Sequence, residues 1–343
     1  MIRPGPRNLI TDVPGILVGN AEDHHARSGT TVVLAEETAT AAADVRGGAP
    51  ATRGASALVP GGIVLGADAV TLSGGSAFGL AAAEGVMSWL AARGRGMLFG
   101  GSRVPSVVGA ILFDLLNGGD KAWGEEPPYR RLGLAASDRA GPAFGLGNAG
   151  AGLGAKAGSL KGGLGSASFV YEDQGAPLTV GAIVASNPLG SVVIPGSSTM
   201  WAWALEQDGE LGGQPPPRAP VHGDALEHAF PGTAPASTAI AVVATDAALT
   251  QAQALRLAMM AQDGFARAIR PSHTPFDGDV IFALATGRRG PLDPAGLGRL
   301  GMLAADCVAR AVARGIFEAE SLGDLPSYRS VHGARLRTGA TDR

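Results

Sequence analysis

Short apolar runs rich in β-branched residues recur along the chain, and Gly, Pro or Asp residues bound them. Runs of four to eight such residues between turn-forming residues are typical of buried β-strands. The pattern therefore predicts strands at 15–18, 30–34, 57–59, 62–65, 168–171, 179–185, 191–194, 238–245 and 280–285.

Three longer segments show instead the spacing of a helix that buries one face, at 76–93, 250–270 and 293–308. Thr250 opens the second segment with a Thr-x-x-Gln capping box, in which side chains and backbone N–H groups bond reciprocally. Asp293 opens the third as N-cap, followed by proline at the first helical position. A glycine after the first segment and a proline after the second mark their ends.

The predicted helices cluster and do not alternate strictly with the strands. That order favours an α/β layered fold, with sheets sandwiched between helix layers, over a regular doubly wound sheet. The polar stretch 206–231, with three consecutive prolines, is typical of an exposed, stiffened connection. Large layered folds run as one domain at this length, so we expect residues 1–343 to form a single domain.

Composition excludes several classes of protein. The chain is 45% hydrophobic and only 17% charged, which excludes disorder. A net charge of −3 without any block of Lys and Arg gives no footprint for nucleic acid, and no apolar stretch approaches the roughly 20 residues that span a bilayer. With one cysteine, Cys307, and no apparent secretory signal, we expect a cytoplasmic protein with neither nucleic-acid nor membrane partners.

Several motif-like patterns fail in their context. Residues 145–150 match G-x-G-x-x-G, but no strand precedes them and a glycine-rich stretch follows. His24 and His25 have no second cluster to complete a metal site, and 74–78 lacks the closing glycine of a hydrolase nucleophile elbow. His273, just before a predicted strand, is interpreted as a turn residue. No metal or other cofactor is implied.

Three polar positions make chemical sense together, although each also has an ordinary structural interpretation. Thr238 opens a buried strand, Lys161 lies in a nearly charge-free glycine segment, and Asn187 follows the strand 179–185. In the structural interpretation, Thr238 starts a strand, Lys161 is an exposed loop residue and Asn187 belongs to a turn. In the functional interpretation, they are a hydroxyl nucleophile, an amine and a donor to an oxyanion.

With these residues the sequence resembles the self-processing L-aminopeptidase/D-esterase family, which includes β-peptidyl aminopeptidases and endo-type 6-aminohexanoate-oligomer (nylon) hydrolases. The resemblance covers nearly the whole chain. It implies a four-layer αββα sandwich of the N-terminal-nucleophile type. The blocks that carry it, in order, are 12–16, 44–48, 72–79, 110–114, 148–152, 160–165, 187–188, 238–246 and 271–279.

Members of this family cut themselves before a Ser or Thr that opens a strand, and that strand ends about eight residues later in a Thr-Asp or Thr-Asn pair. Counting back from Asp246 gives Thr238. The resemblance therefore implies autocleavage between Ser237 and Thr238, into an α chain of residues 1–237 and a β chain of residues 238–343.

The resemblance also implies roles for single residues. Thr238 corresponds to the nucleophile, Lys161 to the amine that tunes its surroundings, and Asn187 to the oxyanion donor. Asp277 and Asp279 correspond to the carboxylates of the Phe-Asp-Gly-Asp block.

The sequence departs from the family pattern at a few of these positions. Ser237 stands before the cut where Asn or Gly is usual, Ala239 replaces a common second Thr, and Phe113 stands where some aminopeptidases of the family have Tyr. The lysine register has an alternative as well, because some relatives place the lysine at the position of Ser159 and not of Lys161.

The function that the resemblance implies is that of an amidohydrolase with an N-terminal threonine. Its substrates would be small peptides, amino-acid amides, β-peptides or ω-amino-acid oligomers such as nylon fragments, and its α and β chains would assemble into a homo-oligomer of heterodimers. Two alternatives stay open at this point: an acyltransferase like ornithine acetyltransferase, and an unprocessed small-ligand binding protein of the same fold.

Overall fold

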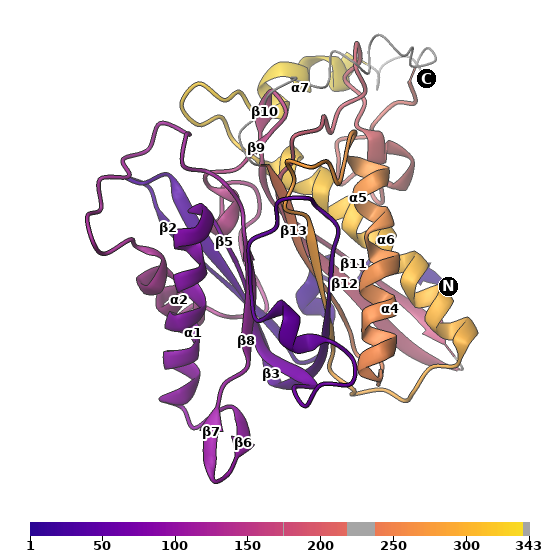
Figure 1. Ribbon diagram of the computed structural model, residues 1–343. Helices are drawn as coiled ribbons and strands as arrows, with labels where there is room; N and C mark the ends of the chain where they lie inside the picture. The colour runs from indigo at the N-terminus through magenta and orange to yellow at the C-terminus, as the bar shows by residue number, and fades with distance from the viewer. Residues whose placement is uncertain (174, 218–236, 339–343) are drawn as a thin grey trace.

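A computed structural model describes residues 1–173, 175–217 and 237–338 of the protein (Figure 1). Its strands are β1 (Ile2–Arg3), β2 (Ile16–Asp23), β3 (Ser28–Val45), β4 (Thr52–Arg53), β5 (Gly66–Ser73), β6 (Met97–Phe99), β7 (Ser102–Val104), β8 (Val107–Ile111), β9 (Lys156–Ala157), β10 (Leu160–Lys161), β11 (Gly163–Asp173), β12 (Ala176–Asn187), β13 (Thr238–Thr245) and β14 (Val280–Ala285). The helices are α1 (Ala82–Ala91), α2 (Tyr129–Asp138), α4 (Gln251–Ala261), α5 (Asp263–Ala268), α6 (Pro294–Glu318) and α7 (Tyr328–Thr338).

Most strands join in the order β1-β11-β12-β13-β14-β3-β5-β8-β4, and β2 pairs with β3. The long strand β3 belongs to both halves of this network. Its first part pairs with β2 and β5, its last part pairs with β14, and its register shifts between Leu34 and Ala39. The strand bends at such an irregularity. One half of the network can therefore fold over the other.

Three clusters of buried apolar residues define four layers. One cluster lies between the α1–α2 pair and the β2–β3–β5 half, a second lies between the two sheet halves, and a third lies between the β11–β14 half and α4, α5 and α6. Figure 1 shows the same order from left to right. The predicted αββα sandwich is the architecture observed.

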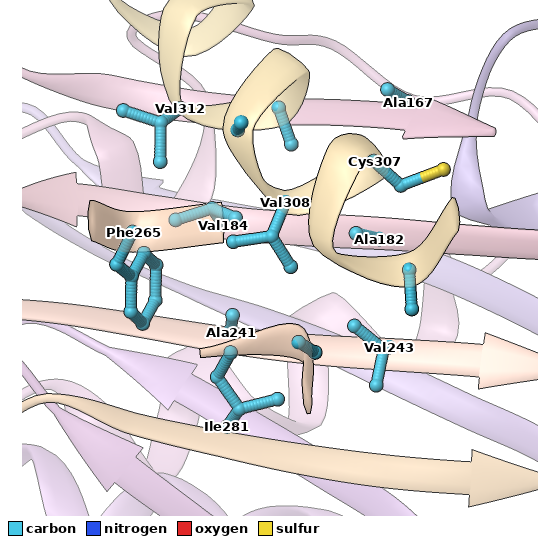
Figure 2. Close-up of a cluster of buried hydrophobic side chains, with 14 of the residues drawn as sticks. Ala167, Ala182, Val184, Ala241, Val243, Phe265, Ile281, Cys307, Val308 and Val312 are labelled. Atoms are coloured by element: carbon cyan, nitrogen blue, oxygen red, sulfur yellow. The ribbon is translucent and has the colours of Figure 1, made fainter. Parts of the chain in front are cut away.

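Strand β13 lies in the middle of its sheet half and is buried on both faces. Ala239, Ala241 and Val243 face the helices, whereas Ile240 and Val242 face the core between the sheets. The small residues on the helix side let α6 pack closely over the strands (Figure 2). On β11, on the far side of β12, a Cβ at position 165 would collide with the backbone of α6. Such close packing holds α6 against this half of the sheet.

Of the strands predicted from the sequence, those at 238–245 and 280–285 are β13 and β14 to the residue. Three others lie within β3, β11 and β12, and 15–18 overlaps β2 from residue 16 onward. Three predictions are wrong. Residues 55–58 form a short 3-10 helix, 191–194 make only isolated bridges, and 62–65 form a loop that exposes 79% of Ile63. An apolar run predicts a strand only where the fold buries it.

The three predicted helices are present. Residues 76–81 form a 3-10 turn that leads into α1, and Thr250 and Gln253 form the capping box before α4. The Asp293 side chain accepts the Gly296 N–H at the start of α6. Strands β5 and β8 and helices α2 and α7 were not predicted. No helix in the described ranges has the length and apolar character needed to cross a bilayer.

Candidate active site

Thr238 lies at the first position of β13, directly opposite Asn187, the last residue of β12. Side chains alternate along a strand, and Ile240 faces the core between the sheets, so Thr238 and its partner Asn187 lie on that inner side too. Only 3% of Thr238 is exposed. The Thr238 side chain therefore faces the core between the two sheet halves, at the end of that core where β13 begins.

The peptide bond before Thr238 is held on its carbonyl side. Thr238 Oγ1 donates to the Ser237 carbonyl oxygen at 2.5 Å, and the Gly278 N–H donates to the same oxygen at 2.8 Å. Glycine is required at this approach because a Cβ at position 278 would lie 2.9 Å from Thr238 Oγ1. The hydroxyl of one residue and the carbonyl of the residue before it are thus brought together beside a backbone donor.

The Asn187 side chain is fixed at both ends. Its Oδ1 accepts the Lys156 N–H at 2.9 Å, and its Nδ2 donates to the Phe113 carbonyl oxygen at 3.2 Å. An amide nitrogen carries two hydrogens, so one donor remains for a further acceptor. Phe113 contributes its backbone carbonyl here.

Lys161 is fully buried. Its Nζ donates to the carbonyl oxygens of Gly152 and Gly162, both at 2.7 Å. Burial lowers the pKa of the Lys161 ammonium to about 7, against the opposing influence of the Asp114 charge. The amine can therefore gain or lose its proton near neutral pH. Ser159, the alternative in the lysine register, lines a pocket of about 340 Å³ together with Leu160 and Ser191.

Asp277 and Asp279 lie on the loop that precedes β14, and both are buried. Asp277 accepts the Thr274 N–H at 2.9 Å and the Thr274 hydroxyl at 2.6 Å. Burial, with the charge of Asp279 beside it, raises the pKa of Asp277 above its usual range. Asp279 accepts the Ala239 N–H at 2.7 Å and so contacts the backbone next to Thr238.

Two further polar residues near these groups were not assigned to the site by the sequence analysis, which gave His273 only a turn role. Asp114 follows β8 and accepts the Ser28 hydroxyl at 2.6 Å and the Gly75 N–H at 2.7 Å. Burial raises the pKa of Asp114, whose charge in turn acts on Lys161. The sequence signal that could have identified Asp114 is a single carboxylate directly after the apolar run 107–113. The second is His273, whose Nδ1 lies 2.8 Å from Asp279 Oδ2.

These groups suit acyl transfer by a hydroxyl: a buried threonine, an amide with a spare donor, an amine that titrates near neutral pH and two carboxylates. The described residues bring Thr238, Asn187, Asp277 and Asp279 into one neighbourhood through the pairing of β12, β13 and the 273–279 loop. Gly162, the neighbour of Lys161, approaches β12 one residue before Asn187, so closely that a Cβ would collide with the Ser186 carbonyl oxygen. No group of three or more His, Cys, Asp and Glu side chains within the described ranges is arranged to hold a metal ion.

Comparison with known proteins decides the family. The model of peptidase family S58 matches residues 8–326. The chain belongs to peptidase family S58. This S58 member is 41% identical over 345 residues to an uncharacterised aminopeptidase of Mycobacterium tuberculosis, a match that covers 94% of this chain and 98% of the relative. It is 28% identical over 292 residues to a 6-aminohexanoate-oligomer endohydrolase of Paenarthrobacter ureafaciens, covering 82% and 76% of the two chains.

A solved structure shows the same fold. The L-aminopeptidase D-Ala-esterase/amidase of Ochrobactrum anthropi superposes on the S58 member with a TM-score of 0.72 and 22% identity, over 98% of this chain and 95% of that one. That structure is described as a variant of the Ntn hydrolase fold. The family and fold expected from the sequence are confirmed, and the protein is a hydrolase of the peptidase and amidase class.

Proposed function

We propose that this S58 peptidase is a self-processing amidohydrolase whose nucleophile is Thr238. The observation that carries the proposal is the geometry of the Ser237–Thr238 peptide. The Thr238 hydroxyl lies 2.5 Å from the Ser237 carbonyl oxygen, and the Gly278 N–H bonds to that same oxygen. A hydroxyl beside a polarised carbonyl is the arrangement that an N-to-O acyl shift needs.

The self-cleavage step follows from this geometry. Thr238 Oγ1 attacks the Ser237 carbonyl carbon, and the Gly278 N–H stabilises the oxyanion that develops. The C–N bond breaks as the nitrogen takes up a proton, which leaves Ser237 esterified to the Thr238 hydroxyl. The shift also frees the α-amine of Thr238, and water then hydrolyses the ester, which restores the Thr238 hydroxyl and releases Ser237 as the carboxylate end of the chain 1–237.

The freed α-amine acts as the base in turnover. Its ordinary pKa lies near 8, so only about a tenth of it is unprotonated at pH 7, and a lower pKa would enlarge the active fraction. Protonated Lys161 lowers the pKa of that amine by like-charge repulsion, whereas Asp277 and Asp279 orient it through the 273–279 loop. The burial of Lys161 and the lowering of its pKa to about 7 support this role over one for Ser159.

Asn187 stabilises the oxyanion of the substrate. Its Nδ2 has one hydrogen on the Phe113 carbonyl and one left for a tetrahedral intermediate on Thr238 Oγ1. The bonds to Phe113 and Lys156 hold this donor in place before substrate arrives, as efficient electrostatic stabilisation requires.

After the cut, strand pairing and a buried ion pair would hold the chains 1–237 and 238–343 together. The strand pairing is the β12–β13 ladder, which runs the full length of β13, together with the β14–β3 ladder. The ion pair is bidentate and joins Arg310 of α6 to Glu210, with N–O distances of 2.6 and 2.9 Å. Bidentate ion pairs of this kind are among the stronger polar contacts in proteins. Separating the two chains would leave each of these buried charges unpaired, which is costly.

We propose small peptides, amino-acid amides, β-peptides or ω-amino-acid oligomers as the substrates. The aminopeptidase and the 6-aminohexanoate-oligomer endohydrolase among the relatives both support an amide substrate. We further propose a cytoplasmic homo-oligomer of cleaved heterodimers, as the family resemblance implies.

Intact-mass measurement and N-terminal sequencing of the purified protein test the proposal. We expect two chains, 1–237 and 238–343, with threonine at the new N-terminus, and a single chain for Thr238→Ala. Amino-acid p-nitroanilides should be hydrolysed only by the cleaved protein. A wild-type chain that stays intact after prolonged incubation would refute self-processing, and transfer of the acyl group to an added amine without hydrolysis would identify an acyltransferase.

A further inference from the structure

The carboxylate of Asp279 is engaged by only two other residues in the described part of the chain. Its Oδ1 accepts the Ala239 N–H at 2.7 Å. Its Oδ2 accepts both hydrogen bonds that His273 offers, from the ring Nδ1 at 2.8 Å and from the backbone N–H at 3.1 Å. Asp279 thus links a histidine on the 273–279 loop to the backbone of the residue that follows Thr238.

We propose that His273 is a positioning residue for the reaction of Thr238. It holds Asp279 against the Ala239 N–H and so fixes the start of β13, which carries the nucleophile. This inference rests on the proposed function. The histidine acts through Asp279, without contact to the substrate.

Cleavage makes this link more important. In the intact chain, Ser237 tethers the strand start, because its N–H donates to the Phe276 carbonyl and its own carbonyl accepts the Gly278 N–H. Ser237 leaves the covalent chain when the peptide is cut. The bond from Ala239 to Asp279 then becomes the tether between the new terminus and the 273–279 loop, beside the ladder to β12.

The backbone of His273 supports a functional reason for the residue. Its φ is +57°, in the left-handed region that favours glycine or asparagine. Its ring packs edge-on against Phe265 of α5, with the ring centroids 6.1 Å apart, and 25% of the side chain is exposed. A strained position occupied by a side chain that bonds a buried carboxylate next to the nucleophile is a pattern of functional sites. The turn role predicted for His273 is present, and the ring has this additional role.

His273→Gly and His273→Asn separate the ring donor from the backbone. Glycine keeps the left-handed backbone and its N–H but removes the ring. Asparagine also tolerates that conformation and carries an amide donor close to the position of Nδ1. We expect His273→Gly to lower kcat on an amino-acid p-nitroanilide by roughly 10 to 100-fold, typical of a displaced supporting contact, with KM changed less than about twofold. His273→Asn should restore most of kcat.

The measurements are the half-time of self-cleavage by intact mass, then kcat and KM of the fully cleaved proteins, with thermal unfolding as a check of the fold. Wild-type kcat in His273→Gly, or an equal loss in the glycine and asparagine variants, would overturn the inference. If His273→Gly does not fold, His273→Gln replaces it. Glutamine carries its amide one bond further out, so kcat should fall below that of the asparagine variant, and equal values in glutamine, asparagine and wild type would overturn the inference. A wild-type chain that is not cut at 237–238 refutes the proposed function instead and needs no His273 variant.

Discussion

The two ends of β13 carry the same residue types and use them differently. At its end, Thr245 donates its hydroxyl to the Thr179 carbonyl at 2.9 Å and accepts the Ala247 N–H at 3.2 Å. The neighbouring Asp246 accepts the Thr179 N–H at 2.8 Å, with Arg289 3.7 Å away. Burial raises the pKa of Asp246, yet every partner is a backbone group or a cation. This end joins β13 to its neighbour β12.

At its beginning, the Thr238 hydroxyl bonds to the carbonyl of the preceding residue. Two buried carboxylates, Asp277 and Asp279, lie on one short loop, and Lys161 is buried with a lowered pKa. Buried charged groups whose charges are not fully paired lower the stability of the fold. Their pKa values are shifted, and such shifted values are concentrated at functional sites. The comparison supports the proposed chemistry at the Thr238 end of the strand and a structural role for the Thr245 end.

The same substitution at each end should separate these roles most strongly. Thr238→Val keeps the branched shape and removes the hydroxyl, so we expect no self-cleavage and amidase activity lower by about 10⁴-fold or more. Thr245→Val should cleave normally and lose about 1 to 3 kcal/mol of stability, because the Thr179 carbonyl loses a buried partner. Intact mass and urea unfolding measure both effects. Normal cleavage in Thr238→Val would contradict the different roles inferred for the two ends of β13.

Asn187 should give the next largest effect. Asn187→Ala is expected to lower kcat by about 100 to 1,000-fold, the usual loss for one oxyanion donor. Asn187→Asp is the matched control, because it can still accept the Lys156 N–H at the same position but has no donor. Equal losses in the two variants indicate that the donor matters. An active Asn187→Asp variant would show that Asn187 only accepts the Lys156 N–H of β9 and is not an oxyanion donor.

Lys161→Met should shift the pH dependence of turnover. Lys161, with a pKa of about 7, is charged below neutral pH and there lowers the pKa of the Thr238 amine. Without that charge the pKa of the amine rises, so the acidic limb of kcat/KM moves to higher pH. About one pH unit corresponds to a tenfold loss on that limb. Ser159→Ala should leave the limb unchanged, and the reverse result would mean that the lysine register is wrong.

The last effect concerns stability and not turnover. Folding lowers the pKa of Lys161 from about 10.5 to about 7, so between these values the unfolded chain binds one more proton than the folded chain. The stability of the lysine protein therefore rises with pH across this window. In a Thr238→Val background, Lys161→Met should be the more stable chain, by a constant margin below pH 7 that shrinks above it by about 1.4 kcal/mol per pH unit. Urea unfolding from pH 6 to 9.5 tests this, and a margin independent of pH would contradict it.

Local pattern predicted the elements that are buried on all sides. The runs that became β13 and β14 have Ala, Ile and Val at nearly every position, and the Asp293–Pro294 pair fixes the start of α6. Strand β5 was missed because its sequence, 66–73, includes Gly, Asp and Thr, and its burial comes from pairing with β3 and β8. Periodicity does not reveal burial that a distant strand provides.

The candidate site divides in the same way. Thr238 and Asn187 were identifiable because each stands at the end of a predicted strand. Asp114 acts on Lys161 across 47 residues of sequence, and the bond from Asp279 to Ala239 spans 40. These contacts arise only when β3, β8 and the 273–279 loop come together, so local sequence carries little trace of them.

The strand order has a consequence for inheritance. Strands β13 and β14 lie side by side between β12 and β3, so in the cleaved protein that we propose the 238–343 chain would be inserted between two strands of the 1–237 chain. Two chains interleaved in this way cannot exchange partners without breaking the ladders from β13 to β12 and from β14 to β3. In a cell that expresses two alleles, each enzyme unit would therefore carry both halves of a single allele. A defect in one half would not be complemented by an intact copy made on another ribosome.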